Sequence, residues 1–175
     1  GAAGRMGQAV VRAVVESGHA LVGAVEGPES PALGKDAGEV ANVGTLGVAI
    51  GADLGSALLG ADVCVDFSVA ALVPTIALHC GRAKVALVSG TTGLDAQAEK
   101  QLDAAAAHVP VLWSPNMSLG VHVLAAIVTQ AVAMLPSFDV EIVEAHHRRK
   151  VDSPSGTAKR LFEAERWAEA AQLLK

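Results

Sequence analysis

The chain has 175 residues, 51% of them hydrophobic, which is enough for one large domain or for one domain with part of a second. Its formal charge of −5 argues against nucleic-acid binding, and we expect no nucleic-acid partner. No signal peptide is visible, the longest apolar run is interrupted by polar residues, and Cys64 and Cys80 lack metal or redox spacing. We therefore expect a cytoplasmic protein with buried free thiols and no membrane contact.

Short apolar runs alternate with segments of helical pattern along the chain. Val-rich runs predict strands at 20–26, 62–68, 84–90, 109–114 and 138–145. Helices are predicted at 5–17, 70–82, 94–108 and 118–135, and a long loop at 27–45. This alternation predicts an α/β fold with a Rossmann-like, doubly wound parallel sheet, which binds ligands at the carboxyl ends of its strands.

The chain opens on the glycine-rich stretch GAAGRMGQAVV, ahead of the first predicted helix. Glycines at 1, 4 and 7 would let a pyrophosphate approach backbone N–H groups at a helix N-terminus. Glu26, at the end of the next predicted strand, could bind the adenosine ribose. A plain glycine turn is the alternative. Residue 27 is Gly rather than a cation, which favours NADH over NADPH, although Arg5 could supply the charge that a 2′-phosphate needs.

Small polar residues follow three later strands, in DFSVAA (66–71), SGTTGL (89–94) and WSPNMSLG (113–120). Gly90, Thr91 and Thr92 could offer amides and hydroxyls to a nicotinamide ribose, and Asn116 could bind a carboxamide. Ordinary turn and capping chemistry is the alternative for each loop alone. Asp95 or Thr92 is predicted to open the third helix, and Ser118 to cap the fourth.

Positive charge and proton-transfer groups are concentrated in EAHHRRKVDSPSGT, residues 144–157. Imidazoles exchange protons near neutral pH, and a lysine beside two arginines gives up its proton more easily. The Ser-Gly-Thr that follows Pro154 would open a helix and seat an anion. We therefore expect a site for a small carboxylate with Lys150 or a histidine as proton donor.

Three alternatives compete for this charged segment. One is a solvated basic loop. Another is a metal site formed by His146, His147 and Asp152, for which adjacent histidines are poorly spaced. A third is a phosphate or nucleic-acid patch, which the absence of nearby aromatic residues disfavours. We predict no metal.

These motifs together resemble the 4-hydroxy-tetrahydrodipicolinate (dihydrodipicolinate) reductase family, from Gly1 to about Ala158. EAHHRRKVDSPSGTA is the most specific of them. The resemblance implies NADH- or NADPH-dependent reduction of a cyclic, dicarboxylate-bearing imine in diaminopimelate and lysine biosynthesis. It assigns catalysis to His146 and Lys150 and substrate binding to His147, Gly156 and Thr157. It assigns cofactor binding to Gly1, Ala2, Ala3, Gly4, Arg5, Met6, Glu26, Gly90, Thr91, Thr92, Ser114, Pro115, Asn116 and Met117.

The resemblance also predicts two domains. Residues 1–117 would bind the dinucleotide, and residues 118–175 would begin an α+β domain that binds substrate and forms homotetramers in the family. Family members have a strand before the glycine loop and continue past the last helix, and some carry Arg where this chain has Val69. We therefore expect a chain truncated at both ends. A non-catalytic nucleotide-binding fragment, or another amino-acid reductase on the same scaffold, are the competing hypotheses.

Overall fold

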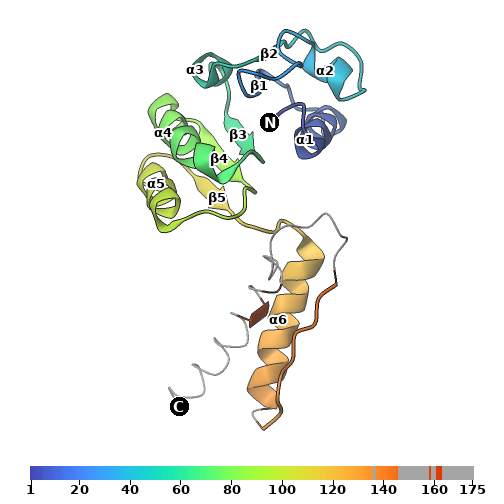
Figure 1. Ribbon diagram of the computed structural model, residues 1–175, viewed down its shortest axis with the longest axis vertical. Helices are drawn as coiled ribbons and strands as arrows, with labels where there is room; N and C mark the ends of the chain where they lie inside the picture. Colours follow the sequence, from blue (N-terminus) through green and yellow to red (C-terminus); the bar gives the residue numbers. More distant parts are fainter. Residues whose placement is uncertain (136, 146–157, 159–160, 163–175) are drawn as a thin grey trace. The chain divides into compact units, whose positions relative to one another are not determined.

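A computed structural model of the chain describes residues 1–135, 137–145, 158 and 161–162 (Figure 1). The chain forms two compact units, Gly1–Ser114 and Pro115–Lys175, and each is described by itself. The first unit holds every strand found among the described residues, and the second holds the long helix α6 (Leu119–Met134).

The strands of the first unit are all parallel and form two sheets. Strand β1 (Ala24–Val25) pairs with β2 (Ile50–Gly51). A second sheet has the order β3-β4-β5, built from Val63–Asp66, Ala86–Ser89 and Val111–Trp113. Parallel strands connected through helices confirm the predicted Rossmann-like α/β class. The described strands are shorter than predicted and form two sheets instead of one continuous sheet.

The four predicted helices are present with nearly the predicted bounds. They are α1 (Arg5–Glu16), α4 (Val73–Ala83) preceded by the 3₁₀ turn η1 (Ala70–Leu72), α5 (Ala96–Ala106) and α6. Asp95 caps α5, because its carboxylate accepts a hydrogen bond of 2.8 Å from the Ala98 N–H. Ser118 occupies the N-cap position of α6 but its side chain makes no capping hydrogen bond.

Sequence patterns missed three short elements, α2 (Ala37–Val40), β2 and α3 (Leu54–Ala57). The predicted long loop at 27–45 contains α2, which Asp36 caps through hydrogen bonds from the Gly38 and Glu39 N–H groups. Asp53 caps α3 in the same way, through the Ser56 N–H. Four-residue helices are too short to show an apolar period, so only their capping aspartates could have indicated them.

The predicted strand at 138–145 is wrong, because its described residues form no strand. Phe138 and Val143 are 68% and 90% exposed. A strand is stable only where a neighbouring strand pairs with its backbone, and no described strand pairs with this segment.

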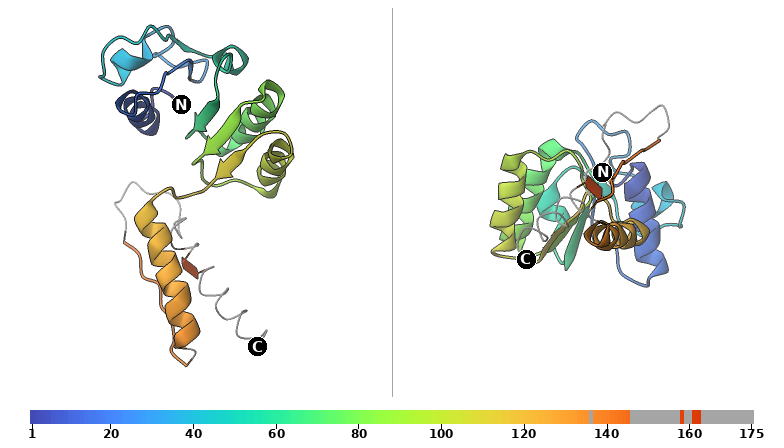
Figure 2. Two further views of the ribbon diagram at one scale, coloured as in Figure 1. Left: turned by 180° about the vertical axis from the view of Figure 1, so that it is seen from behind. Right: turned by 90° about the horizontal axis from the view of Figure 1, so that it is seen from below.

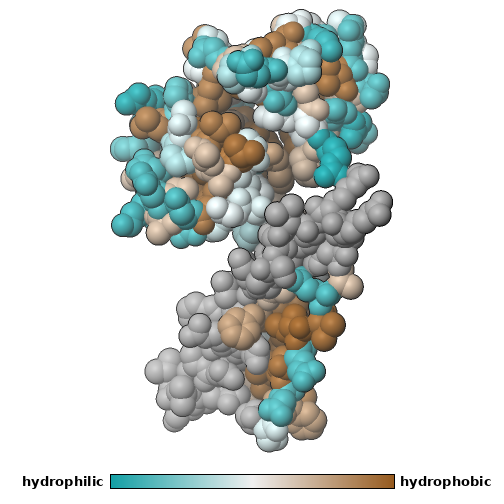
Figure 3. All heavy atoms as spheres, in the orientation of Figure 1, coloured by the Kyte–Doolittle hydropathy of each residue, from teal (hydrophilic) through white to brown (hydrophobic). Residues whose placement is uncertain are grey.

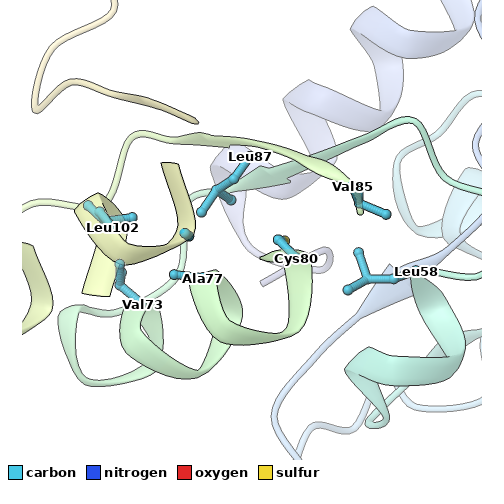
Figure 4. Close-up of a cluster of buried hydrophobic side chains, with 8 residues drawn as sticks. Leu58, Val73, Ala77, Cys80, Val85, Leu87 and Leu102 are labelled. Carbon is cyan, nitrogen blue, oxygen red and sulfur yellow. The ribbon is translucent and has the colours of Figure 1, made fainter. Parts of the chain in front are cut away.

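Helices α4 and α5 lie side by side against one face of the β3-β4-β5 sheet (Figures 1 and 2). Figure 4 shows the core between these helices and the sheet, formed by side chains of α4 and α5, of β4 with the preceding Val85, and of Leu58, which follows α3. Its buried members are Leu58, Val73, Ala77, Cys80, Val85, Leu87, Leu102 and Ala105. Burial of this apolar surface fixes the helices against the sheet and so holds the strands in place.

The opposite face of this sheet stays open in the first unit. Val63, Val65 and Leu112 alternate with the inward-facing residues and remain about half exposed. Figure 3 shows apolar atoms gathered over the middle of this unit. The glycine turn packs on a smaller second core around Ala24, Ala37 and Ile50.

Both cysteines are free, as predicted. Cys80 is fully buried in the core, whereas Cys64 is only partly buried. A hydrogen bond with Cys80, together with burial, raises the pKa of the Cys64 thiol. None of the helices described is both long enough and apolar enough to cross a membrane.

Candidate functional site

The glycine-rich opening forms a tight turn beside the end of β1. The N–H groups of Gly1 and Ala2 both donate to the Val25 carbonyl at 2.9 Å, and the Gly4 N–H donates to the Gly1 carbonyl at 3.1 Å. A methyl group on Gly7 would overlap the Gly1 carbonyl oxygen and lie 2.7 Å from the Cα of Ala2. Only glycine at position 7 therefore lets the turn close against the first turn of α1.

Helix α1 begins directly after this turn, and no side chain caps its N-terminus. Its N-cap residue is Gly4, and the first-turn residues Arg5 and Met6 are exposed. The first N–H groups of a helix have no partner inside the helix, and the helix dipole favours negative charge there. The turn is thus a cradle of backbone donors that suits a phosphate group.

Glu26 follows β1 and is held against the glycine turn. One carboxylate oxygen accepts from the Ala3 N–H at 2.8 Å, and the other accepts from the Gly27 N–H at 3.2 Å. Each oxygen keeps a further lone pair with which it could accept a hydrogen bond from a hydroxyl group. Gly27 is exposed, and space for a Cβ is open there.

Phe67 and Ser68, which follow β3, connect the glycine turn to the loop after β4. A Cβ on Gly1 would lie 3.6 Å from the Phe67 carbonyl oxygen and 3.9 Å from the Cα of Ser68. A Cβ on Gly90 would overlap the Phe67 ring, at 2.7 Å from Cδ1. The structure therefore brings the carboxyl ends of β3 and β4 and the glycine turn into one contiguous surface.

Asp66, the last residue of β3, is buried beneath this surface and was not singled out from the sequence. Its carboxylate accepts hydrogen bonds from Ser89 Oγ at 2.7 Å, Thr91 Oγ1 at 2.8 Å and the Ser68 N–H at 3.0 Å. A buried carboxylate needs such donors to offset its loss of hydration. A lone acid at the end of an apolar strand was the only sequence signal for it.

The two neighbouring threonines of the loop after β4 have different environments. Thr91 is buried, its hydroxyl donates to Asp66, and its carbonyl accepts from Trp113 Nε1 at 2.9 Å. Thr92 is exposed. The hydroxyl available to a ligand at this strand end is therefore that of Thr92, while Thr91 holds the loop.

The Ser68 hydroxyl oxygen is buried and has no hydrogen-bond partner, which is unusual for a polar atom shielded from water. It is the single such side-chain atom in the part of the chain that the structure describes. An orphaned hydroxyl on a residue next to the glycine turn fits a polar ligand such as a dinucleotide.

The predicted 114–117 loop is divided between the two units. The Ser114 N–H donates to the Ser89 carbonyl at 3.1 Å, within the first unit. Asn116 lies in the second unit, where its side-chain oxygen accepts from the Ser118 N–H at 2.8 Å and its carbonyl lies 3.0 Å from His122 Nε2. The predicted carboxamide-binding role of Asn116 stays a prediction.

The predicted catalytic and substrate residues lie outside the described residues. They are His146, His147, Lys150, Gly156 and Thr157. Asp152, which with the two histidines made up the alternative metal site, lies outside them as well.

Two family models match the chain. "Dihydrodipicolinate reductase, N-terminus" matches residues 1–117, and "Dihydrodipicolinate reductase, C-terminus" matches residues 120–172. A 4-hydroxy-tetrahydrodipicolinate reductase of Anaeromyxobacter dehalogenans is 52% identical over 165 residues, which cover 93% of this chain and 61% of that protein. One of Acinetobacter baumannii is 43% identical over 165 residues, covering 94% of this chain and 60% of that protein.

Among solved structures, the dipicolinate-bound dihydrodipicolinate reductase from Paenisporosarcina sp. TG-14 is similar to this chain with a TM-score of 0.74. The two sequences are 26% identical, and the match covers 94% of this chain and 63% of that one. The chain thus spans about 60% of the length of the curated relatives it matches. With family models matching both parts of the sequence, the chain belongs to the dihydrodipicolinate reductase family.

Proposed function

We propose that this chain is part of an NADH- or NADPH-dependent reductase that converts 4-hydroxy-tetrahydrodipicolinate to tetrahydrodipicolinate, in diaminopimelate and lysine biosynthesis. The observation that carries the proposal is the contiguous surface of glycine turn, uncapped helix and strand-end loops in a chain of this family. Its relatives bear the name of this enzyme, and one structural neighbour binds dipicolinate, a planar dicarboxylate.

The first unit holds the dinucleotide in this proposal. Backbone N–H groups of Arg5 and Met6 bind the pyrophosphate, with Gly1, Ala2, Ala3 and Gly4 shaping the turn. Glu26 accepts from the adenosine ribose. Gly90 and Thr92 bind the nicotinamide half, and Thr91 takes part through its backbone alone. The family resemblance adds the loop Ser114, Pro115, Asn116 and Met117. The domain boundary in this proposal follows Met117, with substrate binding beginning at residue 118.

The charged segment supplies the proton. A reduced nicotinamide, when bound, supplies the hydride that the substrate ring takes up. The substrate hydroxyl leaves as water together with a proton from the neighbouring ring carbon, and Lys150 or His146 returns a proton to that carbon as the ring takes up the hydride. His147, Gly156 and Thr157 bind the substrate carboxylates.

NADH is the cofactor we propose this chain to prefer. Glu26 places a carboxylate at the ribose position, where it would repel a 2′-phosphate, and the next residue is Gly27 instead of a cation. The exposed Arg5 is the charge that would let NADPH bind as well. We further propose a cytoplasmic enzyme that forms homotetramers as the full-length protein.

The variant Lys150→Ala tests the reaction. If Lys150 is the acid, kcat falls by about a hundredfold or more, since general acid catalysis contributes this much, while the Kd for NADH stays within about twofold. The measurements are NADH oxidation at 340 nm with the cyclic substrate and NADH fluorescence titration. An equal fold loss in kcat and in affinity for NADH would contradict the role of Lys150. Binding of NADH without turnover by the unmodified chain would favour a nucleotide-binding unit that lacks activity by itself.

A further inference from the structure

Asp66 is a buried acid that lies at the end of β3, next to the loops proposed to bind the cofactor. It has no direct role in the proposed reaction. Asp66 is only 5% exposed, yet both of its carboxylate oxygens are used. Oδ2 accepts from the hydroxyls of Ser89 and Thr91 at 2.7 and 2.8 Å, and Oδ1 accepts from the Ser68 N–H at 3.0 Å. One side chain of β3 thereby holds its own following loop and the loop that follows β4.

Hydrogen bonds hold the backbone of the loop after β4 from both neighbouring strands. The Gly90 N–H donates to the Asp66 carbonyl at 2.8 Å, on the β3 side. On the β5 side, Trp113 Nε1 donates to the Thr91 carbonyl at 2.9 Å. The Phe67 ring lies against Gly90 and leaves no room for a side chain there. The path of residues 89–91 is therefore fixed at both edges of β4.

An uncharged side chain would complete the end of a strand at lower cost, because a buried carboxylate loses far more hydration than a neutral group. The carboxylate, however, attracts three donors to one side chain, namely the hydroxyls of Ser89 and Thr91 and the Ser68 N–H. Hydrogen bonds to an ionised group are shorter and stronger than those between neutral groups. The Thr91 hydroxyl is consequently turned inward, while Thr92 stays exposed.

We propose that Asp66 is a positioning residue that fixes the Gly90–Thr92 loop in the conformation that binds the nicotinamide half of the cofactor. Asp66 acts through Thr91 and Gly90 and does not touch the ligand. This inference rests on the proposed function, because it requires that the loop after β4 faces the nicotinamide. It predicts a defect confined to that half of the dinucleotide, since the glycine turn and Glu26 bind the other half.

The variant Asp66→Asn tests this by comparing two ligands, NADH and ADP-ribose, which lacks the nicotinamide. The side-chain amide keeps one oxygen, which can still accept from the Ser68 N–H, and puts an NH2 group where Oδ2 now accepts from the hydroxyls of Ser89 and Thr91, so both charge-assisted hydrogen bonds are lost and the hydroxyls must turn away. Titration calorimetry should show the Kd for NADH raised about five- to twentyfold, the effect of losing one or two hydrogen bonds, and that for ADP-ribose changed by less than about twofold. The matched control is Asp62→Asn, an exposed aspartate just before the same strand, which should alter neither.

The variant Thr91→Val provides an independent test if Asp66→Asn does not fold, as judged by circular dichroism and thermal unfolding. It removes the same hydroxyl contact while keeping the side chain's shape, so it should weaken NADH binding selectively too. Equal weakening of both ligands would mean that Asp66 serves the fold alone, and unchanged binding of both would also overturn the proposal. If the unmodified chain binds neither ligand, it is instead the proposed function that fails.

Discussion

At the scale of single residues, three positions support the proposed dinucleotide site. Gly7 allows the turn to close, Glu26 presents a carboxylate beside it, and Asp66 holds the neighbouring loop. Each role depends on a contact that a substitution of one or a few atoms would remove or block. Substitutions at these positions therefore give sharp predictions.

Replacing Gly7 with Ala should abolish NADH binding. The added methyl group overlaps the Gly1 carbonyl oxygen, so the turn must open and lose its cradle of N–H groups. Fluorescence titration should show the Kd for NADH raised by about a hundredfold or more, as a displaced backbone cradle implies. The matched control is Gly55→Ala in α3, where the nearest atom is 3.7 Å away. Binding by Gly7→Ala equal to that of the control would contradict the proposed cradle.

Glu26 should determine the choice between the two cofactors. We expect Glu26→Gln to weaken NADH binding by about threefold to tenfold, because a charged acceptor for ribose hydroxyls becomes a neutral one. NADPH binding should strengthen or stay unchanged, since repulsion of the 2′-phosphate is removed. Parallel titrations with both cofactors measure this. A loss shared equally by NADH and NADPH would show that Glu26 only supports the turn.

Only part of the site could be predicted from the residues. Motif residues such as Gly1, Glu26 and Gly90 were singled out because their types suit the chemistry, and the structure places them in one unit. Asp66 was missed, since its function depends on contacts with Ser89 and Thr91, more than twenty residues away. For the same reason, the sequence could not show that the Thr91 hydroxyl turns inward while Thr92 is exposed.

At the scale of elements, capping aspartates determine the structure of segments that have too little apolar pattern to be predicted. Asp36 is the clearest case, because its carboxylate accepts from four backbone N–H groups, those of Gly38, Glu39, Leu46 and Val48, at 2.8–3.1 Å. It thereby ties α2 to the segment that leads into β2. The predicted helices succeeded where the apolar period ran over at least three turns.

Removing the charge of Asp36 should change how stability depends on pH. Backbone hydrogen bonds, that from Leu46 above all, lower the pKa of Asp36 below its usual value of 3.8. The folded state thus holds the proton less tightly than the unfolded state. The stabilisation is fully present above the unfolded pKa and is lost as pH falls through the folded pKa.

The measurement is the urea midpoint between pH 7 and pH 3. Asp36→Asn should be less stable than the unmodified chain at pH 7, and the difference should shrink below about pH 4. Asp62→Asn, at an exposed position, serves as control. A difference that does not depend on pH would show that the hydrogen bonds of Asp36 do not require its charge.

At the scale of the whole chain, the fold class could be predicted because buried parallel strands read as Val-rich runs between amphipathic helices. The same pattern wrongly predicted a strand at 138–145, because an apolar run forms a strand only where another strand pairs with it. The charged segment at 144–157 gave the most specific motif, yet most of it lies outside the described residues. Its role therefore depends on the family and on experiment.

The proposed function depends above all on whether the first unit binds a reduced dinucleotide on the surface formed by the glycine turn and the loops after β3 and β4. Titration of the chain with NADH, followed by ¹H–¹⁵N NMR, tests this most directly. We predict saturable binding, with the largest shifts at the amides of Gly4, Arg5, Met6, Ser68 and Thr92. Absence of saturable binding, or shifts confined to residues remote from this surface, would contradict it.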